Sequence, residues 1–317
     1  MKVLARTLAF LATAVLLVVA GFVAFNWAPD RPVGALLARW APPPSRFLAI
    51  DGLQAHLRDE GPRDDPQPLV LLHGTSASLH TWDGWAARLT PAHRVIRVDL
   101  PGFGLTGPDP HGDYTIERYV HFTLALLDAL GVEHCVIGGN SFGGWVAWET
   151  ALARPDRVAR LVLIDAAGYE PGSTSVPIAF RVARIPLLNE LMKVTLPRSL
   201  IESSVRNVYG DPTRVTPQLV DRYYELTLRA GNREGLVQRF AQAPLGEHAE
   251  WIGRIQQPTL ILWGGRDRLI PPANARRFES EIHGSRLVVF PELGHVPQEE
   301  DPEATVAALQ DFLAKPQ

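Results

Sequence analysis

The 317-residue sequence contains a single cysteine, Cys135, and no strong excess of either charge. One cysteine excludes an intrachain disulfide, and it leaves no CxxC pair or Cys/His cluster that could hold zinc. Cys135 lies in an apolar run, so we interpret it as a small buried residue. The formal net charge of −3 offers no basic surface for nucleic acid, which we exclude as a partner.

Charge is missing altogether from one long stretch near the N-terminus, residues 7–29. A membrane-spanning helix needs roughly 20 apolar residues, whereas the apolar part of a cleaved signal peptide usually has about 7–15. We therefore expect residues 1–28 to form a signal anchor, with Trp27 at the membrane interface. Lys2 and Arg6 favour a cytoplasmic N-terminus, which places the rest of the chain outside the cytoplasm. Cleavage after the VVA at 18–20, giving a secreted or periplasmic protein, stays an alternative.

Behind this run, the sequence divides into a stalk, a core and an insertion. Prolines at 29, 32 and 42–44 predict a stiff stalk over residues 29–45. In residues 46–167 and 258–317, short apolar runs alternate with helical patterns, which predicts an α/β fold with a mostly parallel sheet and helices on both faces. The expected strands are LVLLHG (69–74), RVIRVD (94–99), HCVIGG (134–139), RLVLID (160–165), TLILWG (259–264) and RLVVF (286–290), and the expected helices are 116–130, 145–154 and 273–282. An Asp-Gly pair within 49–58 predicts a leading antiparallel hairpin.

The alternation stops between residues 168 and 257, where prolines separate helix-like pieces and no strand is evident. We expect a helical cap there, inserted after the strand at 160–165 and lying across the carboxyl edge of the sheet. Its apolar residues would be shared between packing and the wall of a substrate cavity; they include Ile185, Leu187, Leu188, Leu191, Met192 and Phe240.

The stretch GNSFG at 139–143 fits the pattern G-x-S-x-G between a predicted strand and a predicted helix. A serine on so tight a turn has a strained backbone, and the positions two before and two after it come close together. Only small residues fit there, which explains Gly139 and Gly143. Ser141 then projects from the end of the strand, and the dipole of the following helix favours negative charge beside it. We predict that Ser141 is a nucleophile.

A serine hydroxyl needs a base, normally a histidine held by a carboxylate. His295 follows the strand at 286–290, and Asp267 follows the strand at 259–264, so both are expected at the carboxyl edge that also presents Ser141. Asp165 also ends a strand and is the rival acid, whereas Asp99 is expected to bond backbone N–H groups in its own turn. The remaining histidines other than His73 are interpreted as surface or capping residues; they are His56, His80, His93, His111, His121, His134, His248 and His283.

An acyl-transfer site also needs preset donors for the charge that develops on oxygen. The backbone N–H of Phe142, directly after the serine, is one. The second is expected from the loop after the strand at 69–74, with the backbone N–H of Thr75 as the best candidate. His73 in the same loop is interpreted as a structural residue that bonds the loop backbone.

Together, the motifs HGTSAS, DLPGFG, GNSFGG, WGGRDRLIP and ELGHVPQEEDPE resemble the α/β-hydrolase superfamily from about residue 69 to 312. The order Ser141, Asp267, His295 matches the family's order of nucleophile, acid and base. The resemblance implies an eight-stranded, mostly parallel sheet, a cap at 168–257 and a triad that needs no metal or organic cofactor. Relatives that open epoxides use aspartate as nucleophile, so Ser141 indicates an acyl-enzyme and, most simply, a carboxylic ester substrate.

Two other functions stay open. Carbon–carbon hydrolases of aromatic-ring breakdown products share GNS-x-GG but tend to have a tryptophan after the histidine, where this chain has Val296 and Pro297. A non-catalytic binding protein of the same fold usually has a broken triad, and this triad is intact. Membrane-tethered relatives acting on monoacylglycerols are also similar, since an anchor would bring the pocket close to lipid. The expected partners are thus a small ester or acyl substrate and a membrane, with the oligomeric state left open.

Overall fold

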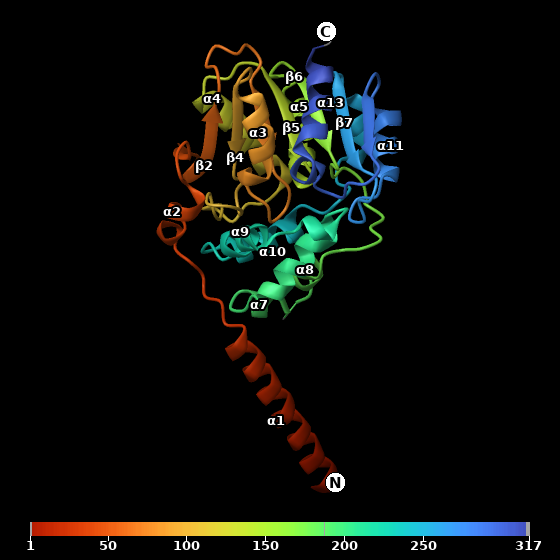
Figure 1. Cartoon of the computed structure of the whole chain (residues 1–317). Helices are drawn as coiled ribbons and strands as arrows, with labels where there is room; N and C mark the ends of the chain where they lie inside the picture. The colour runs from red at the N-terminus through yellow and green to blue at the C-terminus, as the bar shows by residue number, and fades with distance from the viewer. Residues whose placement is uncertain (1, 187, 315–317) are drawn as a thin grey trace.

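A computed structural model describes residues 2–186 and 188–314 (Figure 1). Its centre is one eight-stranded sheet with the order β1-β2-β4-β3-β5-β6-β7-β8, in which β1 and β2 are antiparallel to their neighbours and the other strands are parallel. The strands are β1 (Arg46–Ile50), β2 (Leu53–Glu60), β3 (Leu69–Leu72), β4 (Val95–Val98), β5 (Cys135–Asn140), β6 (Val158–Ile164), β7 (Thr259–Gly264) and β8 (Arg286–Phe290). All six strands expected from apolar runs are present, so the predicted fold class is confirmed.

The hairpin of β1 and β2 turns at the predicted Asp-Gly pair. Asp51 and Gly52 have φ angles of 48° and 79°. Two successive residues with positive φ are typical of the tight turn that matches the twist of an antiparallel pair. The local sequence therefore sets the register of the leading hairpin.

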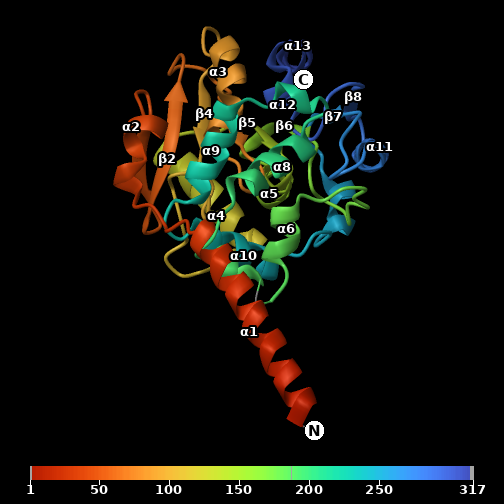
Figure 2. The ribbon, with the colours of Figure 1, turned by 60° about the horizontal axis from the view of Figure 1, so that its bottom comes forward.

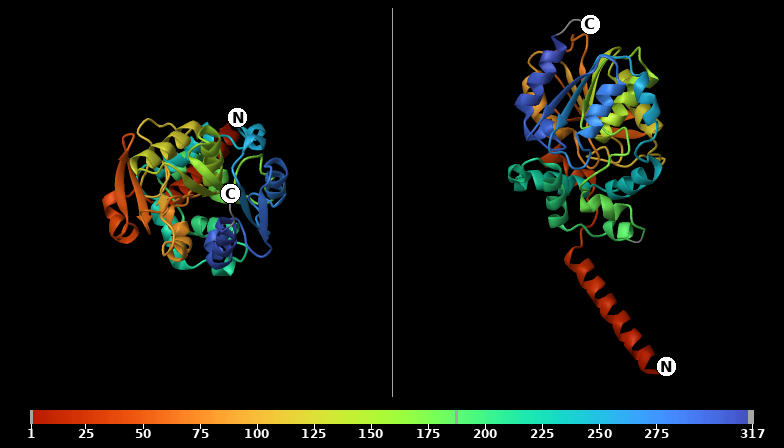
Figure 3. Two further views of the ribbon diagram at one scale, coloured as in Figure 1. Left: turned by 90° about the horizontal axis from the view of Figure 1, so that it is seen from above. Right: turned by 90° about the vertical axis from the view of Figure 1, so that its right-hand side faces the viewer.

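Helices cover both faces of the sheet (Figure 3). On one face, α3 (Asp83–Leu89) and α13 (Pro302–Leu313) pack on alternate strand residues such as Leu69 and Leu71. On the other face, α4 (Ile116–Ala129), α5 (Phe142–Ala153) and α11 (Ala273–Glu281) pack on the residues between them, such as Val70 and Leu72. Successive strand residues point to opposite faces, so strands buried on both sides must be apolar throughout. Cys135 is buried in this core, as expected.

The cap lies across the carboxyl ends of the parallel strands and follows β6, as expected (Figures 1 and 2). It consists of α6 (Ile178–Ala183), α7 (Leu188–Met192), α8 (Arg198–Val208), α9 (Pro217–Thr227) and α10 (Asn232–Gln242). Prolines at 177, 197 and 217 start or directly precede three of these helices, where a missing N–H costs nothing. The prolines thus divide the insertion into short helices that fold over one edge of the core.

Helix α1 (Lys2–Phe25) projects from the cap side and makes no packing contact with the core (Figures 1 and 3). Its segment Arg6–Phe25 has 20 residues, a mean hydropathy of 2.7 and no buried residue. At about 1.5 Å per residue, such a helix is long enough to cross a membrane of roughly 30 Å, although a signal sequence has the same properties.

Residues 26–45, which we call the strap, differ from the free stalk that their prolines suggest. The strap lies along the cap: Ala28 N donates to Val194 O at 3.0 Å, and Arg31 exchanges backbone hydrogen bonds of 2.7 and 2.8 Å with Leu228 and Ala230. Leu36 in the strap is buried with Leu226 of the cap. The strap therefore fixes the cap to the end of α1, because its apolar residues and backbone groups find partners that are far away in the sequence.

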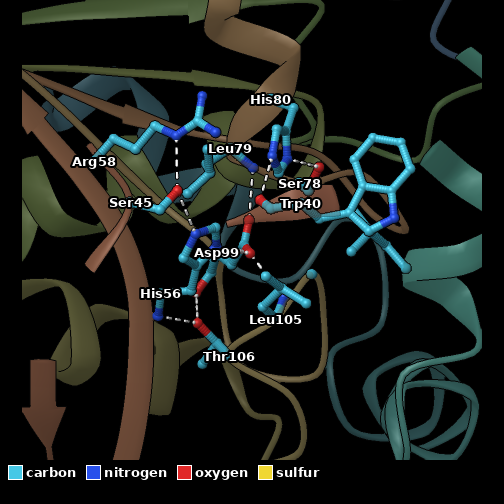
Figure 4. Close-up of polar contacts among 12 residues, drawn as sticks. Trp40, Ser45, His56, Arg58, Ser78, Leu79, His80, Asp99, Leu105 and Thr106 are labelled. Atoms are coloured by element: carbon cyan, nitrogen blue, oxygen red, sulfur yellow. Dashed lines mark hydrogen bonds and ion pairs between the residues drawn. The ribbon is translucent and has the colours of Figure 1, made fainter. Parts of the chain in front are cut away.

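A buried polar network holds the end of the strap on the core (Figure 4). The ring of His56 on β2 bonds Ser45 Oγ at 2.9 Å through Nε2 and Asp99 Oδ2 at 2.7 Å through Nδ1. His80 Nε2 bonds the carbonyl oxygen of Trp40 at 2.9 Å. The interpretation of His56 and His80 as surface or capping residues is therefore wrong, because strap atoms that lie distant in the sequence cover both rings.

Asp99 is the acceptor at the centre of this network. Its carboxylate accepts from the backbone N–H of Leu79 at 2.7 Å and of Leu105 at 2.8 Å, in addition to His56. Burial raises the pKa of Asp99, but the charge and hydrogen bond of His56, together with His73 and His80, outweigh burial and hold that pKa well below its usual range. The expected role of Asp99 in tying down loop backbone is confirmed.

Candidate active site

Ser141 stands at the turn between the end of β5 and the start of α5. Its φ of 56° and ψ of −118° are a conformation that residues with a side chain rarely adopt. Backbone bonds hold the turn on both sides, from Ser141 N to Ile164 O at 2.9 Å and from Trp145 N to Ser141 O at 3.2 Å. The serine thereby lines a cavity between the sheet edge and the cap.

The two glycines of the turn are required by close backbone approach. A Cβ atom at Gly139 would overlap the backbone at Gly143. A Cβ atom at Gly143 would overlap the carbonyl oxygen of Leu72 and lie 2.6 Å from that of His73. The crowding that the sequence pattern predicts is therefore visible, and it forces Ser141 into its strained conformation.

His295 and Asp267 come together at the same edge, from the loops after β8 and β7. Nδ1 of His295 is 2.7 Å from Oδ2 of Asp267, and both side chains are buried. The other oxygen of Asp267 accepts from the backbone N–H of Leu269 at 2.8 Å and of Ile270 at 3.0 Å. This carboxylate is therefore held in place, and it orients the ring of His295 through Nδ1.

His295 and Ser141 line the same cavity. Within the described residues, neither Oγ of Ser141 nor Nε2 of His295 has a hydrogen-bond partner. Hydrogen bonds between catalytic groups are often long before substrate binds and tighten in the complex. Both atoms are thus available for proton transfer when a substrate occupies the cavity.

Asp165, the rival acid, is fully buried beside Asp267 rather than bonded to the histidine. It accepts from Gly264 N at 3.0 Å, and its carboxylate lies within 4.8 Å of ligand atoms of Asp267 and His295. Burial, and then the charge of Asp267, raise the pKa of Asp165 well above the usual carboxyl range. Burial and this neighbouring charge therefore favour the protonated form of Asp165, while Asp267 is the partner of His295.

These three residues are also the one group in the described part of the chain with a spacing that could hold a metal ion. The donor set fits a hydrogen-bond chain better. Nδ1 of His295 is bonded to Asp267, and the raised pKa of Asp165 disfavours the ionised form that a metal ligand needs. The expectation that no metal is involved stays a prediction.

Two further residues position the histidine loop, and the sequence patterns did not single them out. The side-chain amide of Asn140 donates to the carbonyl oxygens of Ile164 at 3.1 Å and of His295 at 2.9 Å. Glu300 accepts from Gly294 N at 2.7 Å and from the cap residue Gly210 at 2.9 Å. Asn140 occupies the variable position directly before the serine in G-x-S-x-G, and this position is the one feature of the sequence that could have indicated its role. No sequence pattern indicates the role of Glu300.

The two predicted oxyanion donors lie close to Ser141 in different loops: Phe142 follows it directly, and Thr75 lines a cavity with it. Phe142 is the first residue of α5, so its N–H has no partner within the helix, and Thr75 lines the cavity in the loop after β3. No acceptor for the N–H of Phe142 or of Thr75 occurs among the residues that the structure describes. Both groups are therefore free to bind a negatively charged oxygen.

His73 stabilises this loop through two hydrogen bonds of its ring. Its Nδ1–H donates to the carbonyl oxygen of Gly74 at 2.8 Å, and its Nε2 accepts from Leu100 N at 3.0 Å. Burial lowers the pKa of His73, which keeps the ring neutral and able to do both. The structural interpretation of His73 is confirmed.

The cavity at Ser141, together with the solvent space at its mouth, has a volume of about 760 Å³. Beyond the polar end, its walls are mainly apolar and come from the cap; they include Met192, Leu196, Ile201, Val205, Val208 and Leu236. Of the cap residues expected to be shared with a cavity, Met192 lines this one and Phe240 lines a second, whereas Ile185 and Leu188 are exposed. Leu187 lies outside the described residues.

Comparison with known proteins places this geometry in context. A family model described as the alpha/beta hydrolase fold matches residues 67–302. Among curated proteins, a 2-hydroxy-6-oxo-2,4-heptadienoate hydrolase from Pseudomonas putida strain F1 is 30% identical over 286 residues, which cover 85% of this chain and 96% of the relative.

Two solved structures are similar in different ways. A meta-cleavage product hydrolase from Pseudomonas fluorescens IP01 is 27% identical with a TM-score of 0.73, covering 85% of this chain and 96% of its own. A membrane phospholipase A is 25% identical with a TM-score of 0.72, but the match covers 99% of this chain and 98% of its own. Because this second match covers 99% of the chain, it includes α1 and the strap.

Proposed function

The chain belongs to the α/β-hydrolase fold family, and on that basis we propose that it hydrolyses carboxylic esters through an acyl-enzyme on Ser141. One observation carries the proposal. Ser141, His295 and Thr75 line one cavity whose other walls are mainly apolar, and the N–H group of Phe142, directly after the serine, is free at the start of α5. An acyl chain fits the apolar part while its carbonyl group lies at the polar end.

Each group then has a defined task. Oγ of Ser141 attacks the ester carbonyl carbon as its proton passes to Nε2 of His295, and Asp267 stabilises the resulting imidazolium. The N–H groups of Thr75 and Phe142 bind the oxyanion of the tetrahedral intermediate. His295 returns the proton to the leaving alcohol, which leaves an acyl ester on Ser141. Water attacks that ester by the same route, so the products are a carboxylic acid and the free enzyme.

The membrane supplies the substrate in this proposal. The strap holds the cap at the end of α1, so an anchored helix would keep the cap, and the cavity beneath it, next to the bilayer (Figure 1). Phe25 and Trp27 are exposed at this junction, as are Ile178, Ile185 and Leu188 on the nearby cap. The charge pattern before the span favours a catalytic domain outside the cytoplasm, with a cleaved, secreted form as the alternative.

Hydrolysis of a carbon–carbon bond is the second candidate. The curated relative and one of the two solved structures carry names of such enzymes, so by name they support this candidate more than the first. The same serine, histidine and oxyanion donors could serve it. The apolar cavity and the nearly full-length match to a membrane phospholipase A favour ester hydrolysis.

A substrate panel with a Ser141→Ala variant separates the candidates. We expect the full-length protein to hydrolyse nitrophenyl esters of graded acyl length, and the variant to lose at least about 10³-fold in kcat while staying folded by circular dichroism. Cleavage of a vinylogous diketone with no ester hydrolysis would replace the first candidate by the second. Failure of the wild-type protein to react with a fluorophosphonate would contradict both and favour a binding protein.

A further inference from the structure

A second cavity meets the first at Ser141. Ser141, Thr75 and Phe180 line both cavities, which places the second one beside the nucleophile and under the cap. Its walls differ in one respect, because the guanidinium groups of Arg184 and Arg239 contribute to them. In the first cavity, none of the described lining residues carries a permanent charge.

Arg239 on α10 is buried and has no anionic partner. It is 2% exposed, and no carboxylate or other hydrogen-bond acceptor is paired with it among the described residues; its Nε in particular is buried and unbonded. The buried Arg233 bonds Asp30 at 2.6 Å, and of the half-buried arginines of the cap Arg222 bonds Glu299 at 2.5 Å and Arg229 bonds the carbonyl oxygens of Ala230 and Thr106. Arg239 is therefore an exception within its own domain.

The guanidinium group of Arg239 lies against two aromatic rings. The Cζ atom of Arg239 lies 4.2 Å from the ring centre of Phe142 and 5.1 Å from that of Phe240. Arg184 lies over the same Phe240 ring, at 4.5 Å. Stacking on a ring offsets only part of the free-energy cost of burying an ion. Two cations that share one ring also repel each other, so an anion between them would relieve both costs.

The pKa of Arg239 is consistent with a bound anion. Burial, with a smaller contribution from the charge of Arg184, lowers the pKa of Arg239 to about 10. The side chain therefore remains a cation at neutral pH despite the burial, and it has donors without acceptors beside the nucleophile.

We propose that Arg239, assisted by Arg184, binds an anionic group of the substrate, a carboxylate or a phosphate, in the second cavity, which adjoins the apolar acyl site at Ser141. A guanidinium group presents several N–H donors in one plane, which suits both kinds of oxyanion. The substrate would then be an ester with an apolar acyl chain and an acidic alcohol portion. This inference deepens the proposed ester hydrolysis and rests on it for the kinetic test below.

The kinetic test compares three esters of one acyl chain on the full-length protein in detergent: a decanoyl monoglyceride, its phosphate monoester, and decanoyl glycolate. The quantity measured is kcat/KM for each anionic ester divided by kcat/KM for the neutral one. In Arg239→Gln we expect this ratio to fall about 10- to 100-fold for one or both anions, because a hydrogen bond to a charged group is lost. Which anion shows the larger fall identifies the phosphate or the carboxylate as the ligand.

Further variants distinguish binding from a structural role. Arg239→Lys should recover part of the ratio, and Arg184→Gln should lower it in the same direction by a smaller factor. Arg181→Gln is the matched control, because Arg181 is an exposed arginine of α6 that lines neither cavity, and it should leave the ratio unchanged. An unchanged ratio in Arg239→Gln would overturn the proposal and leave Arg239 as a support for the Phe142 ring.

A binding experiment remains informative if no ester is hydrolysed. Decanoate and decyl phosphate are titrated calorimetrically into Ser141→Ala protein and into the same protein carrying Arg239→Gln. We expect Kd to rise at least about 10-fold for one of these anions in the double variant. Equal Kd values would refute the anion site, whereas a clear difference without ester hydrolysis would refute only the proposed reaction.

Discussion

Replacing Asn140 by alanine tests whether the serine turn holds the histidine loop in place. The side chain of Asn140 is 2% exposed and donates to Ile164 O at 3.1 Å and to His295 O at 2.9 Å. Ile164 O also accepts from Ser141 N, so it keeps a partner in the variant. For His295 O, Asn140 is the one donor recorded among the described residues, so this carbonyl group is left unsatisfied.

The expected magnitudes follow from these two bonds. Loss of the bond to Ile164 costs about 0.5–1.5 kcal/mol, and an unsatisfied buried carbonyl group at His295 costs about 1–3 kcal/mol. The free energy of unfolding should therefore fall by about 1.5–4.5 kcal/mol. A misplacement of about 1 Å in a catalytic group can cost about 100-fold in rate, so we expect kcat/KM per folded molecule to fall about 10- to 100-fold.

The assay is hydrolysis of a soluble nitrophenyl ester at a temperature where circular dichroism shows all variants folded. Gln257→Ala is the matched control, because its buried side-chain amide donates to Ala151 O at 2.9 Å away from the cavity. It should lose stability and keep its kcat/KM per folded molecule. Wild-type kcat/KM in Asn140→Ala would refute the role of this amide in positioning the imidazole.

Three other predictions test the acid, the strap and the serine turn. Burial raises the pKa of Asp165, so the contribution of Asp165 to stability is fully present below the ordinary carboxyl pKa of about 4 and declines as pH rises above it. In urea titrations, Asp165→Asn should therefore gain stability relative to wild type as pH rises above about 4, and a difference that stays constant with pH would contradict this. Leu36→Ala should lower the free energy of unfolding by about 2–5 kcal/mol and speed proteolysis in the strap, because Leu36 is 1% exposed. An unchanged rate of proteolysis would mean that the strap is not packed on the cap. Gly143→Ala should lower the free energy of unfolding by about 1–3 kcal/mol and abolish most of the esterase activity. Gly253→Ala is the control and should change neither, because the nearest atom would be 3.7 Å from the added Cβ. An active Gly143→Ala enzyme would refute the crowding argument.

The sheet and the serine turn could be predicted because each is set by neighbouring residues. Strands buried on both faces must be apolar throughout, so β3, β5 and β7 stand out in the sequence without any knowledge of the fold. A serine between glycines at a strand end has few conformations to adopt, and its φ of 56° follows from the space that Gly139 and Gly143 leave.

The strap and the buried histidines could not be predicted in the same way. Prolines in the strap suggest an extended stalk, yet its apolar residues and backbone groups find partners on cap helices. His56 and His80 carry no pattern that distinguishes them from surface histidines. Their burial depends on Ser45 and Trp40, which the strap brings to them.

The sequence by itself determined the fold class, the strained serine and the order of the candidate triad, because apolar periodicity and glycine spacing act over a few residues. Only the tertiary structure decided that His295 meets Asp267 rather than Asp165, and that the buried Arg239, unlike Arg222 and Arg233, lacks an anionic partner among the described residues. The physical reason is that the pKa and the pairing of an ionisable group depend on its nearest partners and on its loss of contact with water. Both depend on contacts between segments that the chain order does not bring together.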